Sequence, residues 1–461
     1  MTATLAESLA AYAERLRFED LPATAVHEVK RRLIDSFACA LGALGADAPT
    51  IAARVARRVT ATPAATLIDG GTSIAPLAAF ANGVLVRYLD FNDTYLSLEP
   101  AHPSDNLPAV LATAEVAGRD GRDVIVAAAL AYEVQCRFCD AASIRARGWD
   151  HVTYGSFSTA LAAAKLLGCD ARRMEHALGL AGVNGVALRQ TRAGELSMWK
   201  GCAFANSARN GVFAALVAAD GMTGPAPIFE GVFGFEKLVS GPLGALDVSN
   251  WGGAGRRFMI NETYIKFWPA EYHSQSAIDA ALQIRAEIGG GDKTLDAIDR
   301  IDIDSFDAAV DIIGSDPEKW RPKTRETADH SLPYCVAVAF ADGEVGHDQF
   351  APARFQDERL LALVARTQIH RDATLTARYP AGIPNRLRVK LTDGRELVRE
   401  VEFPRGHARN PMTDAEVELK FHAEAQPHLK PAERSAVLQK VWSLDSLNDV
   451  RGLMALVGVR R

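Results

Sequence analysis

DVIVAAALAYEVQCRFC, residues 123–139, is apolar or alanine on nearly every side of the helix that it predicts. A helix without a wet face is expected in the middle of a bundle rather than on its surface. Alanine has the highest intrinsic helix propensity. The same composition recurs at Pro108–Val116, Ser156–Leu167 and Ala203–Ala219. These segments predict a large helical core.

Helical patterns extend on both sides of this core, over roughly the first 260 residues. Thr24–Leu44 has one apolar face, made by residues spaced three or four apart: Val26, Val29, Leu33, Phe37 and Leu41. Helical patterns return after Pro411, where Thr413 and Asp414 are candidate N-caps.

Between these helical parts the pattern changes to that of strands. Ile301-Asp302-Ile303-Asp304 alternates apolar and charged residues, which predicts a strand with one wet face. Further on, Leu387–Leu391 and Leu397–Phe403 alternate on either side of Asp393-Gly394, a strong hairpin signal. We therefore predict a mainly α protein, in which a large all-helical domain contains an inserted, smaller α/β lid domain. The expected bounds are 1–264 and 406–461 for the helical domain and 265–405 for the lid.

Composition and charge exclude several classes of protein. Of the 461 residues, 48% are hydrophobic and 23% are charged, which is typical of globular proteins. The net charge is −6, from 51 basic and 57 acidic residues, and no basic tract stands out, which argues against nucleic acid as a partner. The longest uncharged stretch, Gly70–Val86, contains Pro76 and Asn82 and is too short for a membrane span.

The cysteines and the N-terminus favour the cytoplasm. Six scattered cysteines lie mostly in Ala-rich or aromatic stretches, as expected of small buried side chains in a reducing compartment. Met1–Leu9 has no basic region before an apolar run, so no signal peptide is expected. Cys136 and Cys139 form a C-x-x-C within a helical run, where buried helix positions are favoured over a redox or metal role.

A dense polar segment interrupts the apolar helices. It consists of Asp90-Phe91-Asn92-Asp93-Thr94-Tyr95 and His102-Pro103-Ser104-Asp105-Asn106. Pro100 and Pro103 are expected to hold His102 in a non-helical turn. Asp93 and Asp105 have an alternative as helix caps, and the acids with His102 have one as metal ligands. For Asp90 and His102 we favour a function, because polar groups beside apolar helices must be satisfied.

Other candidate residues lie at scattered positions. Lys200 is expected at the mouth of an Ala-rich helix, and Lys266 where the helical part gives way to the insert. A lone lysine between aromatic residues is usually a snorkelling surface residue, which is the alternative for both. His151 follows Arg147 and Trp149 and is equally well explained by a structural role.

Three blocks resemble, in this order, parts of the MmgE/PrpD family. They are residues 90–106, residues 266–275 (KFWPAEYHSQ) and residues 325–334 (RETADHSLPY). The resemblance implies an all-helical large domain, a smaller lid domain, a homodimer and chemistry on citrate-like acids without metal or other cofactor. Similar members include 2-methylcitrate dehydratases, cis-aconitate decarboxylases and iminodisuccinate epimerases.

The resemblance also implies roles for individual residues. Asp90, His102, Lys200 and Lys266 are expected to be catalytic. The substrate carboxylates and hydroxyl are expected to be held by Thr94, His151, His330 and Tyr334. The run HPSDNL at 102–107 and the RETADHS block look most like the 2-methylcitrate dehydratases. The aromatic pair Phe267-Trp268 departs from the pattern.

We therefore expect a cytoplasmic hydro-lyase that converts 2-methylcitrate to 2-methylaconitate, in propionate catabolism. Removing a proton beside a carboxylate builds up charge that fixed cations must stabilise, which suits Lys200 and Lys266. His102 and Asp90 would then be the acid and the base, in either order. Decarboxylation or epimerisation of a related polycarboxylate needs the same groups and stays open. So does a non-catalytic binding protein on the same fold.

Overall fold

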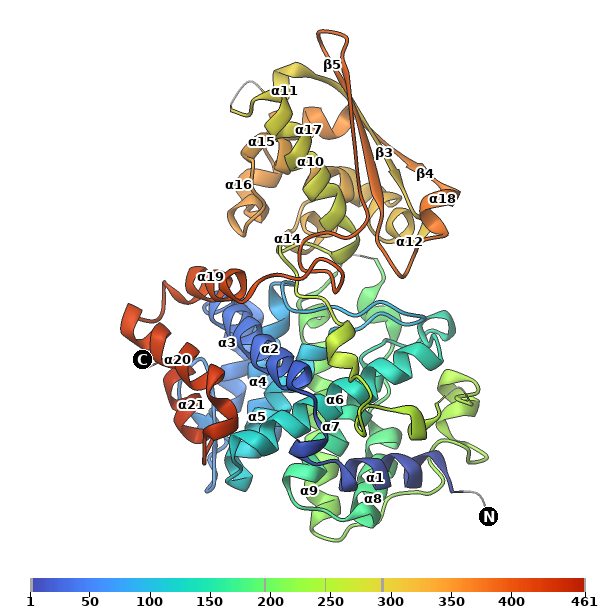
Figure 1. Ribbon diagram of the computed structural model, residues 1–461, viewed down its shortest axis with the longest axis vertical. Coiled ribbons are helices and arrows are strands. Elements are labelled where there is room, and N and C mark those ends of the chain that lie inside the picture. Colours follow the sequence, from blue (N-terminus) through green and yellow to red (C-terminus); the bar gives the residue numbers. More distant parts are fainter. Residues whose placement is uncertain (1–2, 195, 245, 292–293, 460–461) are drawn as a thin grey trace. The chain divides into compact units, whose positions relative to one another are not determined.

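The computed structural model describes residues 3–194, 196–244, 246–291 and 294–459. It divides into two compact units: unit 1 comprises Met1–Thr263 and Thr413–Arg461, and unit 2 comprises Tyr264–Met412. Unit 1 is helical, and unit 2 combines helices with a small sheet (Figure 1). The predicted mainly α class is confirmed.

The second boundary between the units lies at 412, against the 405 expected from the sequence. The reason is a turn that follows the last strand of unit 2. His407 stacks on Tyr264, with ring centroids 4.4 Å apart, and lies 4.9 Å from the Phe403 ring. The amide of Gly406 donates to the carbonyl of Asn410 at 2.9 Å, which closes the turn.

The core of unit 1 consists of helices that pack against one another along their lengths. α7 packs between α6 and α9, and α4 packs on α5 and α9 (Figure 1). The helices of unit 1 are α1 (Leu5–Arg15), α2 (Ala23–Gly42), α3 (Asp47–Ala56), α4 (Ala75–Tyr88), α5 (Leu107–Ala117), α6 (Gly121–Ala141), α7 (Thr153–Leu166), α8 (Ala171–Asn184), α9 (Ala203–Ala219), α19 (Asp414–Ala425), α20 (Pro431–Trp442) and α21 (Arg451–Val457). A two-stranded hairpin, β1 (Ala65–Thr66) and β2 (Thr72–Ser73), completes the regular structure.

The sequence patterns place these helices closely. α9 has the predicted bounds, and α2 begins one residue before the predicted Thr24. At the start of α19, Thr413 and Glu416 form a capping box, which confirms the predicted N-cap. The helix predicted at 123–139 is α6, and its alanines are buried as expected.

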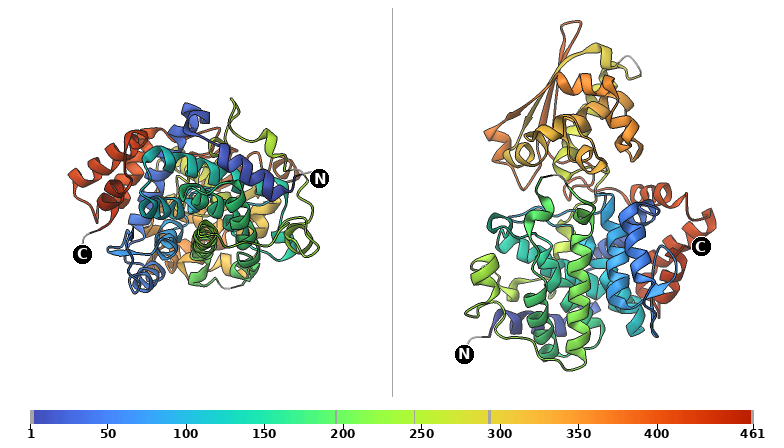
Figure 2. Two further views of the ribbon diagram at one scale, coloured as in Figure 1. Left: turned by 90° about the horizontal axis from the view of Figure 1, so that it is seen from below. Right: turned by 180° about the vertical axis from the view of Figure 1, so that it is seen from behind.

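Both ends of the chain contribute to unit 1. α19 packs against α2, and α21 lies near β1. Figure 2 shows the C-terminal helices beside the first helices of the unit in a second view. The helical part predicted before and after the insert is therefore one packed body.

The sheet of unit 2 has the strand order β4-β3-β5-β6. Its strands are β3 (Ile298–Ser305), β4 (Thr367–Arg371), β5 (Asn385–Leu391) and β6 (Glu396–Val401). β3 and β4 are parallel, whereas β5 pairs antiparallel with both β3 and β6. Gly394 has φ +91° in the turn between β5 and β6, so the predicted Asp393-Gly394 hairpin is confirmed.

The longer helices of unit 2 are α10, α15 and α17. α10 packs on β5 and β6, and α15 packs on both α10 and α17. Their bounds, with those of the short helices, are α10 (Gln275–Ile288), α11 (Thr294–Ala297), α12 (Asp307–Ala309), α13 (Pro317–Trp320), α14 (Arg325–Ala328), α15 (Leu332–Asp342), α16 (Pro352–Phe355), α17 (Glu358–Ala365) and α18 (Ala373–Thr376).

The wet face predicted for β3 is wrong. Asp302 and Asp304 are only 6% and 7% exposed. Arg388 donates to both carboxylate oxygens of Asp304, at 2.8 and 3.1 Å, and His370 Nε2 lies 2.9 Å from Asp302 Oδ1. Long side chains of the neighbouring strands therefore cover these carboxylates, an effect that alternation within one strand does not reveal.

No single helix in the described ranges is both long enough and apolar enough to cross a membrane. One bent pair, α2 with α3, meets at 100° and passes that test by length and composition alone.

Glycine allows α7 and α9 to approach closely, and this contact is testable. A Cβ on Gly211 of α9 would lie 2.0 Å from Thr159 Oγ1 and 2.9 Å from the Ala160 nitrogen of α7. We expect Gly211→Ala to lower the free energy of unfolding by about 1–3 kcal/mol, because the helices must separate. The matched control is Gly452→Ala in α21, where the nearest atom would be 3.7 Å away. It should be neutral or stabilising in the same urea denaturation experiment. Equal stability of the two variants would contradict the prediction.

Candidate functional site

The polar segment predicted from the sequence is a loop between α4 and α5. An isolated bridge between Tyr95 and Ala101 closes this loop, so that Thr94 and His102 face each other. Asp90, which begins the loop, has φ +52°, a left-handed conformation that aspartate tolerates better than most residues. The loop continues into a 3-10 helix at Pro103–Asn106.

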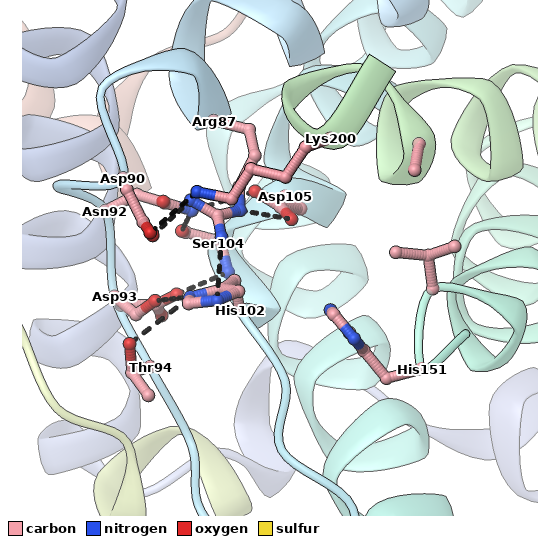
Figure 3. Close-up of polar contacts among 12 residues, drawn as sticks. Arg87, Asp90, Asn92, Asp93, Thr94, His102, Ser104, Asp105, His151 and Lys200 are labelled. Atoms are coloured by element: carbon pink, nitrogen blue, oxygen red, sulfur yellow. Dashed lines mark hydrogen bonds and ion pairs between the residues drawn. The ribbon is translucent and has the colours of Figure 1, made fainter. Parts of the chain in front are cut away.

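The Asp90 carboxylate lies between two cations (Figure 3). One oxygen accepts from Nη1 of Arg87, in the last turn of α4, and the other lies 2.9 Å from Lys200 Nζ. Asp90 is 1% exposed, and Arg87 and Lys200 are also buried. A buried carboxylate needs such neutralisation, and this group of three carries one more positive than negative charge.

His102 is held in a defined tautomer beside this ion pair. Its Nδ1 lies 2.7 Å from the Asp93 carbonyl oxygen and 3.2 Å from Thr94 Oγ1. Its Nε2 lies 3.0 Å from Nη2 of Arg87. Because a guanidinium only donates, we assign Nε2 as the acceptor and place the ring proton on Nδ1, where it is donated to Asp93. This imidazole is therefore neutral.

His151 forms a second, different arrangement near His102. The two imidazole centroids are 6.0 Å apart, and Figure 3 shows the His151 ring on the side of the site that His102 faces. Its Nδ1 lies 2.9 Å from Asp150 Oδ1. The other Asp150 oxygen lies 3.1 Å from Arg192 Nε. Among the described residues, no group hydrogen-bonds with the buried Nε2 of His151.

The charge state of this arrangement follows from its surroundings. Burial lowers the pKa of His151, and the nearby Arg192 adds to this effect against the opposing charge of Asp150. Burial alone would raise the pKa of Asp150. Arg192 and His151 outweigh this effect and hold the pKa well below its usual range. The result is an ionised Asp150 that orients a neutral His151, whose free nitrogen can accept a proton.

The acids considered as helix caps have different partners. Asp93 accepts from the Ser104 amide at 2.8 Å and from the Tyr132 hydroxyl at 2.7 Å, so it caps the short helix at Pro103–Asn106. Asp105 accepts instead from Asn92 Nδ2 at 2.8 Å, and the capping alternative is wrong for this residue. Burial raises the pKa of Asp105 to about 7, to which the charge of Asp93 also contributes.

The remaining predicted site residues lie in unit 2. Lys266 is 1% exposed, and its charge acts on Glu271. Burial alone would raise the pKa of Glu271. Nearby positive groups outweigh this effect and lower the pKa to about 2: His273, His330 and Lys266. Lys266 is therefore a buried cation in a charged cluster, and the snorkelling alternative for it is wrong.

His330 and Tyr334 differ in how they are held. His330 Nδ1 contacts the Asp329 carboxylate within the same block. Tyr334 is fully buried, and its hydroxyl donates to the Gln349 carbonyl at 2.6 Å. The structure gives the hydroxyl of Tyr334 a partner within unit 2, and a substrate contact for it stays a prediction.

Sequence reasoning missed three residues of the unit 1 site: Arg87, Asp150 and Arg192. Arg87 is the single charged residue of the otherwise apolar helix α4, which is a signal that the sequence offers. Asp150 directly precedes His151, so a search for acids beside candidate histidines would have found it. Arg192 lies forty-two positions after Asp150, and no local pattern connects them.

The described part of the chain contains no cluster of three or more His, Cys, Asp and Glu side chains suited to a metal ion. Cys136 and Cys139 are both buried free thiols, as are the other four cysteines. Burial raises the pKa of both thiols well above the usual range. The interpretation of this C-x-x-C as buried helix positions is confirmed.

Comparisons with known proteins give consistent matches along the chain. Residues 7–244 match the MmgE/PrpD N-terminal domain, and residues 268–444 match the MmgE/PrpD C-terminal domain. The 2-methylcitrate dehydratase of Escherichia coli (strain K12) is 31% identical over 356 residues, which cover 72% of this chain and 71% of that protein. The 2-methylcitrate dehydratase of Cupriavidus necator is 30% identical over 453 residues, covering 92% and 90%. Alkylcitrate dehydratase phiI of a fungal species (strain ATCC 74256) is 28% identical, covering 86% and 83%.

Proposed function

The chain belongs to the MmgE/PrpD family, and we propose that it is a hydro-lyase that eliminates water from 2-methylcitrate to form 2-methylaconitate, without a cofactor. The activities named for its relatives support this reaction. The observation that carries the proposal is the buried Asp90 carboxylate between Arg87 and Lys200, next to two neutral histidines.

The charge of the site suits the charge of this substrate. 2-Methylcitrate carries three carboxylates, and the elimination pushes further charge onto the carboxylate beside the carbon that loses its proton. Arg87 and Lys200 are two buried cations that share the Asp90 carboxylate, and the second acid near Arg87, Asp105, has its pKa raised by burial to about 7. Fixed cations in a dry site stabilise developing negative charge far better than they would in water.

The geometry supports a division of the proton transfers between the two histidines. Two cations favour the ionised form of Asp90, so this residue has no proton to give to the departing hydroxyl. We assign Asp90 the task of holding Arg87 and Lys200 in place. His151 accepts the substrate proton at its free Nε2. Once substrate has displaced Arg87 from His102 Nε2, that nitrogen takes up a proton from solvent and gives it to the departing hydroxide, which leaves as water, while His151 returns the substrate proton to solvent.

The other predicted residues complete the proposal. Thr94 lies against His102 and is placed to hold the substrate hydroxyl or a carboxylate. Lys266 is proposed as a further cation for the substrate carboxylates, with His330 and Tyr334 as binding residues from unit 2.

We also propose a cytoplasmic homodimer that acts in propionate catabolism. The six cysteines are free thiols, which suits a reducing compartment. Met198 and Trp199 are 48% and 46% exposed beside Lys200, and Phe213 of α9 is 58% exposed. Large exposed apolar side chains of this kind are typical of subunit interfaces. We expect sedimentation equilibrium to give twice the 49.6 kDa chain mass, and a monomer at micromolar concentration would contradict the dimer.

The proposed reaction has a direct test. Purified protein treated with a metal chelator and incubated with 2-methylcitrate should raise the ultraviolet absorbance as the conjugated alkene forms. Citrate and cis-aconitate in parallel reactions identify the related chemistries, and carbon dioxide release identifies decarboxylation. Activity that is lost on chelation and regained with iron would contradict the cofactor-free proposal. No turnover of any of these acids would contradict the enzyme itself.

The assignment of His151 as the base predicts how kcat/KM depends on pH. Because burial lowers the pKa of His151, its Nε2 stays unprotonated until the pH falls below the usual histidine range near 6.5. We expect the kcat/KM of the wild type to fall on that acidic side. His151→Asn should lower kcat by about 10²–10⁴-fold and remove this limb.

The matched variant for this experiment is His102→Asn. It should retain the acidic limb, because His151 is intact, although its kcat falls. The opposite result, in which the limb disappears with His102 and persists without His151, would make His102 the base.

A further inference from the structure

A contact from the C-terminal part of unit 1 reaches the loop that carries Asp90. Lys420 of α19 donates from Nζ to the carbonyl oxygen of Phe91 at 2.8 Å. The same Nζ lies 3.5 Å from the centroid of the Phe91 ring and 2.6 Å from Asp35 Oδ1 of α2. Lys420 is 8% exposed, and Asp35 is fully buried. The lysine therefore makes a cation–π contact, an ion pair and a hydrogen bond in one buried place.

The contact lies next to a residue whose backbone conformation is unfavourable. Phe91 directly follows Asp90, whose left-handed backbone is less favourable than an extended or helical one. Such a conformation persists only where surrounding contacts fix it. The neighbouring loop residues are held by other groups: Asn92 donates to Ser104, and Asp93 accepts from Tyr132 at its side chain and from His102 at its backbone carbonyl. At Phe91, Lys420 contacts both the backbone carbonyl and the ring.

The backbone at Phe91 controls the direction of the Asp90 side chain. The Phe91 carbonyl is part of the peptide group between Phe91 and Asn92. A hydrogen bond to this carbonyl restricts rotation about the backbone bonds of Phe91, the residue that directly follows Asp90. The two oxygens of the Asp90 carboxylate contact Arg87 and Lys200 respectively, and a rotated backbone would turn the carboxylate away from at least one of them. Asp35 balances the charge of Lys420, so this anchor adds no net charge near the site.

We propose that Lys420 is a positioning residue for the reaction, acting on Asp90 through the Phe91 carbonyl. This inference rests on the proposed dehydratase function and adds a part of the machinery that comes from the C-terminal helices. Lys420 reaches the loop at the Phe91 carbonyl, directly after Asp90, so its effect on Asp90 passes through the loop backbone.

A simple substitution does not separate positioning from stability. Lys420→Met leaves the buried Asp35 carboxylate without its ion-pair partner, which is destabilising in itself. The double variant Asp35→Asn/Lys420→Met removes both charges and thereby avoids an unpaired buried charge. It still lacks the donor to Phe91. Asp35→Asn alone keeps that donor, and the exposed lysine of the same chain segment, Lys430, provides a control as Lys430→Met.

The experiment measures kcat, KM and melting temperature for these variants with 2-methylcitrate. We expect the double variant to melt no lower than Asp35→Asn, in which Lys420 has lost its ion-pair partner, but to have a kcat up to about 100-fold lower, since small misplacements of catalytic groups have effects of this size. Its KM should change little. Lys420→Arg should restore part of kcat, because the guanidinium can donate to the same carbonyl. Lys430→Met should match the wild type. A double variant with the kcat of Asp35→Asn would overturn the proposal and leave Lys420 a purely structural residue.

A second measurement separates this proposal from the proposed function. Hydrogen exchange of the peptide covering residues 88–96 should be faster in the double variant than in Asp35→Asn, whatever the substrate. If the wild type does not turn over 2-methylcitrate, the dehydratase function fails and the exchange result still decides the anchoring role. Unchanged exchange in this peptide would overturn the positioning by Lys420.

Discussion

The Asp90 carboxylate is withdrawn from water, and its charge must be compensated within the protein. This constraint accounts for the placement of the surrounding elements. The last turn of α4 carries Arg87, which pairs with one Asp90 oxygen, and the segment before α9 carries Lys200, which pairs with the other. The loop itself folds back through the Tyr95–Ala101 bridge, which brings His102 against Arg87. Replacement of Asp90 by an uncharged residue would deprive two buried cations, Arg87 and Lys200, of the carboxylate that they share, a strongly unfavourable arrangement.

The Ala-rich helices serve this arrangement because they provide a closely packed and rigid frame. α7 and α9 approach at Gly211, and the 3-10 helix at Pro103–Asn106, which belongs to the polar loop, packs against α6, α7 and α9. The cations are thus oriented before substrate binds, which is the condition under which electrostatic stabilisation of a transition state is most effective. His102 and His151 show two solutions to the same demand for a fixed imidazole: one is oriented by a backbone carbonyl and the other by a carboxylate.

Local sequence patterns predicted the parts of the molecule that depend on near neighbours. The apolar composition of residues 123–139 indicated a buried helix, and Asp393-Gly394 indicated the hairpin. The density of acids, amides and a histidine in the polar loop predicted a site there, and the structure brings Asp90, His102 and Lys200 together around Arg87. Contacts between distant positions were not predictable in this way. The shielding of Asp304 by Arg388, the pairing of Asp150 with Arg192 and the attachment of residues 406–412 to unit 2 all depend on the folded chain.

The contact between Lys420 and Phe91 joins residues that are 329 positions apart in the sequence. A ribosome that adds about 5–20 residues per second needs on the order of 15–65 s to synthesise the intervening chain. Once Lys200 has been added, the nascent helical bundle contains Asp90, Arg87, His102 and Lys200, but α19 has not yet been made. The smaller unit also has to emerge before the helical unit is complete. A truncated translation product that ends within the insert would therefore carry most of the catalytic side chains in a bundle with an exposed α2 surface, a species suited to recognition by chaperones.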